Sequence, residues 1–239
     1  MNNLGPWLAR SFSTFFERPW QYCLLGLAWF GISFGASMVV MVPVLFLLPL
    51  AHLFGEWLIW AGMAPAIFVL WGVQGVAVAG LHRAIERLVN EGEWRFLDML
   101  PYDIAFSSMG LTFFMATLST LSLFFCMVPL VPIMGAWGLS MAVLAREGGG
   151  MFHALGRSWE LSRDNFWEMC LYFFIAGLLF FAVSYIPLLG PFIAWPVMTL
   201  LTIVPYQALA EGDIIQDHGT PIEVEDRDPE NPYQAPRQV

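Results

Sequence analysis

The fold of this chain is decided by residues 152–171, FHALGRSWELSRDNFWEMCL, an amphipathic stretch with two arginines that leads directly into a long apolar run. A second stretch, residues 8–24, matches residues 155–171 without a gap. Six of the seventeen aligned positions are identical: Leu8 and Leu155, Arg10 and Arg157, Ser11 and Ser158, Trp20 and Trp167, Cys23 and Cys170, and Leu24 and Leu171. The match predicts a duplicated unit in which an amphipathic lead helix precedes an apolar helix.

The overall composition is that of a membrane protein. Of the 239 residues, 58% are hydrophobic and 12% are charged, whereas a soluble domain carries about 25% charged residues. Several apolar runs approach the roughly 20 residues that cross the ~30 Å hydrocarbon core as a helix. The sequence therefore predicts an all-α integral membrane protein. Its net charge is −9 and no basic patch dominates, so nucleic acid is not expected as a partner.

Six transmembrane helices are predicted, arranged as three hairpins at about residues 20–82, 104–146 and 166–210. Each hairpin follows an amphipathic lead that lies in the membrane interface. A Glu-Gly pair closes each unit: Glu91 and Gly92, Glu147 and Gly148, and Glu211 and Gly212. Because two spans per unit return the chain to the same side, the repeats are parallel and are related by an axis near the membrane normal. Residues 1–212 are thus predicted to form one membrane domain.

Three stretches are expected to depart from regular spans. Residues 43–55 contain two prolines and a glycine, which predicts a break that packs on the membrane surface or is re-entrant. Residues 131–145 measure about 22 Å as a helix, so this fourth span crosses only if its turn dips inward or the bilayer thins. Residues 213–239 are acidic and rich in proline, which predicts a disordered tail on the cytoplasmic side.

All ten basic residues are arginines, and they fall on one side of the six-span arrangement. The turns on the opposite side contain none. By the positive-inside rule the arginine side is cytoplasmic, and both termini are therefore predicted to be inside the cell.

Six of these arginines are candidate contacts for a lipid headgroup or a protein partner: Arg10, Arg18, Arg83, Arg87, Arg157 and Arg163. In a threefold bundle they would ring its cytoplasmic mouth. The favoured interpretation is that they fix the topology and reach lipid phosphates by snorkelling. The sharper hypothesis is that they bind an anionic lipid headgroup or the acidic surface of a membrane or cytoplasmic protein.

Residues that could carry catalysis or bind a metal are sparse. Ionisable side chains, which are costly in a membrane and therefore mark functional sites, are absent from the middle of each predicted span. Gln74 is the most polar residue at mid-depth and is expected to bond a neighbouring helix. His52 and Glu56 are four residues apart, but two ligands do not make a metal site. No catalytic residue, metal or cofactor is predicted.

A possible acid/base group occurs on the third lead helix, where His153, Arg157 and Glu160 share one face. The same three residues also fit the solvated face of an amphipathic helix, which is the favoured interpretation. Phosphate-binding loops, nucleophile elbows and zinc-protease motifs do not occur in the sequence.

The Glu-Gly joints, the amphipathic helices that begin with Phe, and the short outer turns with aromatic residues and prolines resemble a group of uncharacterised six-span bacterial membrane proteins. That group is similar to the membrane domain that precedes some glycerophosphodiester phosphodiesterases. The resemblance covers roughly residues 8–212. It implies a six-span topology in a bacterial inner membrane, and it supplies no catalytic residues.

The leading functional hypothesis is a non-enzymatic membrane scaffold or accessory subunit that binds lipid or a protein partner. A transporter or channel for a small or lipid-like solute is the first alternative, and it requires a polar path between the hairpins. An intramembrane lipid-modifying enzyme is the second, and it requires His, Glu or Arg side chains that converge at headgroup depth.

Overall fold

The computed structural model describes residues 4–55, 57–124, 129–186 and 190–217, and all regular secondary structure in these ranges is helical. The elements are α1 (Leu4–Glu17), α2 (Pro19–Phe54), α3 (Trp57–Glu91), η1 (Phe96–Met99), η2 (Tyr102–Ile104), α4 (Ala105–Phe124), α5 (Leu130–Trp137), α6 (Ser140–Glu147), α7 (Met151–Arg163), α8 (Phe166–Ser184) and α9 (Gly190–Asp217). Within the described residues, five segments are long and apolar enough to cross a membrane: Pro19–Val42, Pro65–Glu91, Phe96–Ser122, Phe166–Ser184 and Phe192–Ala210. The predicted all-α class is confirmed.

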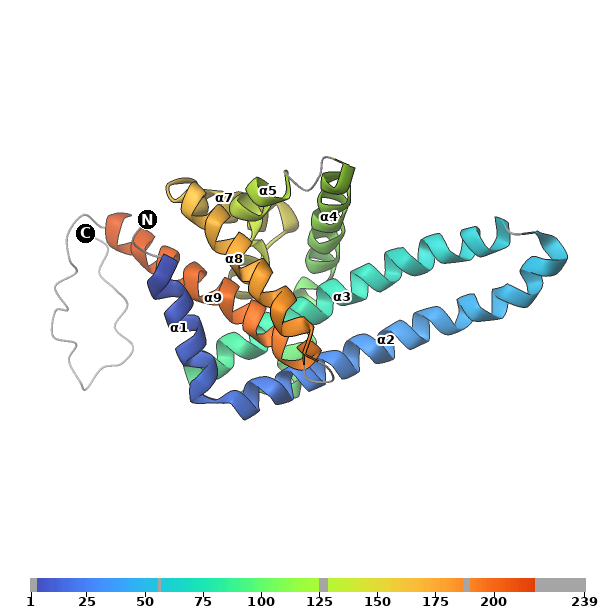
Figure 1. Ribbon diagram of the computed structural model, residues 1–239, viewed down its shortest axis with the longest axis horizontal. Helices are drawn as coiled ribbons and strands as arrows, with labels where there is room; N and C mark the ends of the chain where they lie inside the picture. Colours follow the sequence, from blue (N-terminus) through green and yellow to red (C-terminus); the bar gives the residue numbers. More distant parts are fainter. Residues whose placement is uncertain (1–3, 56, 125–128, 187–189, 218–239) are drawn as a thin grey trace.

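The longest elements, α2 and α3, form a hairpin arm that reaches beyond the other helices (Figure 1). With 36 residues, α2 is about 54 Å long at 1.5 Å per residue. The break predicted at residues 43–55 does not occur, because α2 stays helical through Pro43 and Pro49 and ends at Phe54. A proline removes one helical hydrogen bond, but leaving the helix in apolar surroundings exposes several backbone groups, which costs more. The turn falls instead at Gly55, whose φ is +101°.

The apolar helices form a closed series of contacts. Helix α2 packs on α3 and α9, α3 packs on α4, α4 touches α5, and α8 packs on both α5 and α9. Small residues permit the close approaches: Gly26 lies against Phe192 of α9, Gly75 against Ser108 of α4, and Gly135 against Cys170 of α8. Helix α3 also contacts α9.

Residues 130–147 form two short helices, α5 and α6, and not the single helix predicted for residues 131–145. The reason lies in α7, whose Ser158 and Ser162 hydroxyls donate to the Ala136 carbonyl oxygen at 3.0 and 3.2 Å. That carbonyl would otherwise accept the next helical hydrogen bond. Because α7 satisfies it, the chain can turn at Gly138, which packs against the Phe173 ring.

The two matching sequence stretches turn equivalent faces toward the core. Helix α2 begins at Pro19 and α8 begins at Phe166, which is 147 positions later. Eight residues between positions 4 and 33 are buried, and seven of them have a buried counterpart 147 positions later. These seven are Trp7, Ser11, Phe15, Tyr22, Leu25, Gly26 and Trp29, which correspond to Ala154, Ser158, Ser162, Met169, Tyr172, Phe173 and Ala176. The second lead differs, because residues 96–104 form two 3-10 turns, η1 and η2.

Two of the three predicted Glu-Gly joints end helices. Gly92 and Gly148 have φ values of +79° and +72°, and their amides close α3 and α6 by donating to carbonyl oxygens four residues earlier at 3.1 Å. Glycine suits this left-handed position because it has no Cβ. The prediction that the third Glu-Gly pair ends a helix is wrong, since α9 continues through Glu211 and Gly212 to Asp217. The predicted tail of residues 213–239 therefore begins in helix, and residues 218–239 lie outside the described part of the chain.

Candidate functional site

The end of the molecule where α3 and α6 finish carries most of the arginines, and several of them join helices. The Arg83 guanidinium on α3 donates to both carboxylate oxygens of Asp103 at 2.6 Å and to the Ala145 carbonyl oxygen of α6 at 3.0 Å. The Arg87 guanidinium bonds Glu91 at 3.0 Å and Asp98 of η1 at 2.5 Å. These contacts fasten the connection from α3 to α4.

The other candidate arginines lie in different surroundings. Arg18 donates to the Gly92 carbonyl oxygen at 2.8 Å, which joins the start of α2 to the end of α3. Arg10 is exposed on α1. Arg163, at the end of α7, forms an ion pair with its neighbour Asp164 at 3.4 Å, and its side chain is 60% exposed. The six predicted arginines therefore have different local contacts, and Arg83 and Arg87 line one common cavity.

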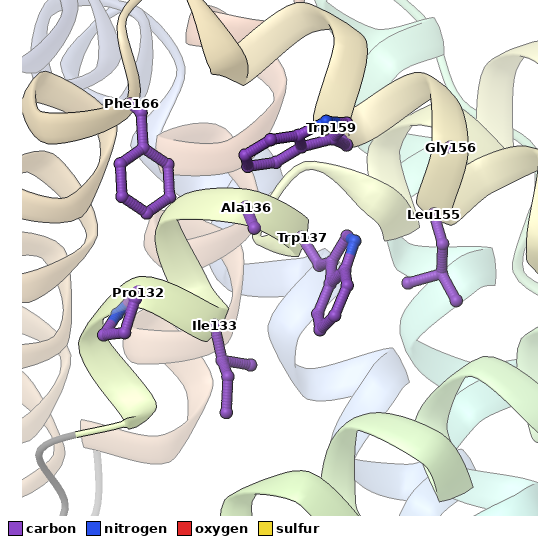
Figure 2. A pocket seen from close by; sticks show the side chains of 8 residues that line it. All are labelled: Pro132, Ile133, Ala136, Trp137, Leu155, Gly156, Trp159 and Phe166. Atoms are coloured by element: carbon purple, nitrogen blue, oxygen red, sulfur yellow. The ribbon is translucent and has the colours of Figure 1, made fainter.

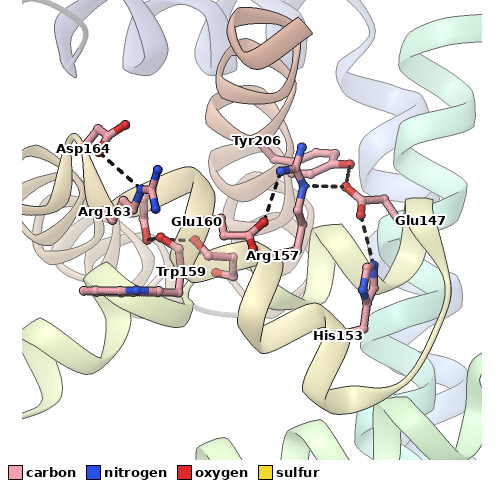
Figure 3. A network of polar contacts seen from close by, with 10 residues as sticks. Glu147, His153, Arg157, Trp159, Glu160, Arg163, Asp164 and Tyr206 are labelled. Atoms are coloured by element: carbon pink, nitrogen blue, oxygen red, sulfur yellow. Dashed lines mark hydrogen bonds and ion pairs between the residues drawn. The ribbon is translucent and has the colours of Figure 1, made fainter. Parts of the chain in front are cut away.

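A polar cluster on α6, α7 and α9 surrounds the Glu147 carboxylate (Figure 3). It accepts a hydrogen bond from the Tyr206 hydroxyl at 2.8 Å, and it lies 3.4 Å from His153 and 3.7 Å from Arg157. Arg157 also contacts Glu160 at 3.4 Å. Tyr206 could not be assigned to this cluster from the sequence, because it lies 59 residues from Glu147.

These ion pairs position helices more than they stabilise the fold. Partly exposed pairs each contribute about 0–1 kcal/mol, and the side chains of Arg83 and Asp103 are 27% and 63% exposed. The two parallel hydrogen bonds between Arg83 and Asp103 contribute energy, and they also fix the relative orientation of the two side chains. An anionic headgroup that took over the bidentate contact of Arg83 would have to displace the Asp103 carboxylate.

An open apolar groove lies between α5, α7 and the start of α8 (Figure 2). Its volume is about 560 Å³, and it is lined by Pro132, Ile133, Ala136, Trp137, Leu155, Gly156, Trp159 and Phe166. Gly156 helps to keep it open, because a Cβ at this position would meet no atom within 4 Å. The groove was not predicted from the sequence, although the sequence has a residue without a side chain, Gly156, on the lead helix.

Arg163 is the last residue of α7 and lies one helical turn beyond Trp159, which lines the groove. Its guanidinium pairs with the adjacent Asp164 and is largely exposed. An exposed guanidinium therefore lies one helical turn along α7 from a residue that lines the apolar groove.

Exposed aromatic side chains surround the arginine-bearing end. Trp20, Trp167, Tyr102, Phe106 and Phe152 each expose more than three quarters of their surface, and each lies near the start of an apolar helix or on a lead segment. Such aromatic residues are typical of the membrane–water interface, where their rings sit at headgroup level. One of these residues, Trp167, directly follows Phe166, which lines the groove.

Three polar candidates were predicted outside this end: Gln74, His52 and Glu56. Gln74 is half-buried in α3. The side chain of His52 and all of Glu56 lie outside the part of the chain that the structure describes. Among the described residues, no three His, Cys, Asp or Glu side chains are placed to hold a metal ion.

No family model, curated protein or solved structure matches this chain. Its helices and composition define the class: a helical protein with several candidate membrane-spanning segments. Within this class, its distinguishing features are an amphipathic lead helix, a broken α5–α6 segment and the apolar groove between them.

Proposed function

We propose that this chain is a non-enzymatic, multi-pass membrane scaffold or accessory subunit that binds a lipid acyl chain in the α5–α7 groove. The open apolar groove carries this proposal, and the exposed Arg163 lies one helical turn beyond the lining residue Trp159. Its volume of about 560 Å³ lies within the roughly 300–1,000 Å³ of small-molecule sites. An apolar space at headgroup depth accepts a chain, and the guanidinium favours an anionic headgroup.

The topology proposed for this function has six spans, with α5 and α6 together as a broken fourth span. The burial match between α1–α2 and α7–α8 supports a duplicated unit, and the two Glu-Gly helix ends support a shared boundary between units. The arginine end is placed in the cytoplasm, with the chain in a bacterial inner membrane.

This orientation predicts opposite accessibilities for two loops. In a background without Cys23, Cys126 and Cys170, a single cysteine at Gly149 should resist a membrane-impermeant maleimide added to intact cells, whereas one at Ile186 should react. Both residues are exposed, so accessibility depends on the side of the membrane. Lysed cells provide the control, since both sites should then react. Labelling of Gly149→Cys in intact cells would contradict the proposed topology.

Filling the groove should remove bound lipid. Gly156→Leu places an apolar side chain where the structure leaves space, and it exchanges a poor helix former for a good one, so the protein should fold. Native mass spectrometry of protein purified in mild detergent should show at least a fivefold loss of copurified phospholipid, because the added side chain occupies the space of the acyl chain.

The matched control is Gly5→Leu on α1, where an added Cβ also meets nothing within 4 Å. It should leave the lipid content unchanged. Equal lipid content in Gly156→Leu, Gly5→Leu and the unaltered protein would overturn the groove as a lipid site.

One observation favours a second candidate, a lipid-modifying enzyme, because His153, Arg157 and Tyr206 converge on Glu147. The groove is lined by other residues, so this cluster does not line the proposed site for the acyl chain. Release of a water-soluble product from labelled phospholipid vesicles, abolished by Glu147→Gln, would favour the enzyme over the scaffold.

A further inference from the structure

A second cavity lies where α3, η1 and α6 meet. Its volume is about 420 Å³. It is lined by Arg83, Glu86, Arg87, Asn90, Glu91, Asp98, Ala145 and Arg146. None of these residues lines the apolar groove. This polar cavity is therefore a separate feature, and the proposed lipid function does not use it.

The donors of the polar cavity are partly occupied. Arg83 uses its Nε and both Nη atoms on Ala145 and Asp103. Arg87 uses Nε and Nη1 on Glu91 and Asp98, which leaves Nη2. Arg146 contacts Glu86 through Nε at 3.2 Å while its guanidinium lies over the Tyr206 ring, 5.6 Å from the centroid. Two guanidinium groups, from α3 and α6, thus keep N–H donors that bond no other described residue.

The hydrogen-bond acceptors of the polar cavity are also only partly occupied. Glu86 is contacted through Oε1 and Glu91 through Oε2, so each carboxylate keeps a second oxygen that bonds no described residue. The amide of Asn90 adds one donor and one acceptor group. Glu86 and Asp98 are well shielded, with side chains 17% exposed, which strengthens their electrostatic interactions relative to those in water.

The cavity has no net charge, because three arginines face Glu86, Glu91 and Asp98. A simple anion would meet these carboxylates, and a simple cation would meet the guanidinium groups. A ligand that carries both charges satisfies both sets of free atoms. We propose that this cavity binds a small zwitterion with an oxyanion and a primary ammonium, the chemistry of phosphoethanolamine, either as a lipid headgroup or as a free solute.

In this arrangement the oxyanion accepts hydrogen bonds from Arg87 and Arg146, and the ammonium donates to Glu86 and Glu91. The charged partners lie on two helices, so the ligand joins the end of α3 to the end of α6. Each charged group of the ligand then faces side chains of opposite charge. No shielded charge in the cavity is left unpaired, which would be costly.

The test uses full-length protein in mild detergent. Native mass spectrometry with equal concentrations of synthetic phosphatidylethanolamine and phosphatidylglycerol measures headgroup preference, and calorimetry with phosphoethanolamine measures binding of the free solute. Binding in the first arm alone identifies a lipid headgroup, and binding in both identifies the zwitterion itself. Preference for phosphatidylglycerol, or binding in neither arm, would overturn the proposal.

Glu91→Gln should weaken the preferred binding about tenfold, because it removes one charged hydrogen-bond acceptor. The matched control is Glu160→Gln, which removes an exposed acid that pairs with Arg157 outside this cavity. Asn90→Leu is the second variant, and it should reduce binding without removing an ion pair. Equal affinity in Glu91→Gln, Asn90→Leu and the control would rule out the site.

Gly156→Leu separates this inference from the proposed lipid function. It fills the groove but leaves the polar cavity intact, so binding of free phosphoethanolamine should persist in that variant. Loss of that binding in Gly156→Leu would show that the polar cavity is not an independent site.

Discussion

Replacement of Gly26 by alanine is expected to destabilise this protein by about 3 kcal/mol, at the upper end of the cost of overpacking. An added Cβ would overlap the carbonyl group of Phe192. Because the obstacle is backbone and not the end of a side chain, α2 and α9 must move apart. Their separation would open the series of contacts between helices. Unfolding in mild detergent, followed by circular dichroism, should show a clearly lower midpoint for Gly26→Ala.

Gly31→Ala, on the same helix, is the control. A Cβ at Gly31 meets no atom within 4 Å, and alanine is a better helix former by roughly 0.8–1.0 kcal/mol. This variant should be as stable as the unaltered protein or slightly more stable. Equal midpoints for the two variants would contradict the close contact of α2 with α9.

The sequence predicted the elements whose signal is local. Apolar runs of sufficient length predicted helices, and the structure has helices there. Positive φ at Gly92 and Gly148 follows from glycine after the last helical turn. Each of these properties depends on neighbours within one or two turns, so a single sequence suffices to find them.

The errors occurred where distant groups decide the backbone. Prolines at 43 and 49 indicated a break in α2, but apolar surroundings favour a continuous helix. Residues 131–145 looked like one helix because nothing local shows that Ser158 and Ser162 take over the Ala136 carbonyl. Glu211 and Gly212 repeat an earlier motif, yet α9 continues past them.

The candidate site was predicted only in part for the same reason. The arginines could be assigned to one end of the molecule from their positions between apolar runs. Their partners could not, since Asp103 lies 20 residues from Arg83 and Ala145 lies 62 residues away. A groove is a property of three helices together, and the sequence of α7 alone shows only that Gly156 leaves space beside Trp159.

The centre of the molecule, where α3 meets α9, is expected to depend on His82. This residue is buried, with Nδ1 2.9 Å from the Val78 carbonyl oxygen and Nε2 2.8 Å from the Thr202 hydroxyl. Since a carbonyl only accepts, Nδ1 carries the proton. The Thr202 hydroxyl lies 2.8 Å from both His82 Nε2 and the Thr199 carbonyl oxygen, and its single hydrogen donates to one of these two acceptors at a time. His82→Ala removes both hydrogen bonds and leaves a cavity, so a loss of about 3 kcal/mol is expected, by comparison with other large-to-small changes in cores.

Thr202→Val separates the contribution of the hydrogen bond from the contribution of packing, because it removes the hydroxyl and keeps the shape of the side chain. Hydrogen bonds between membrane helices average about 0.6 kcal/mol, so this variant should lose far less stability than His82→Ala in the same detergent assay. A transporter with a hydrated path between α3 and α9 predicts a different result: water would fill the space left by His82, and His82→Ala would then cost no more than Thr202→Val. Unequal losses therefore support a closed, packed centre and with it the scaffold over the transporter.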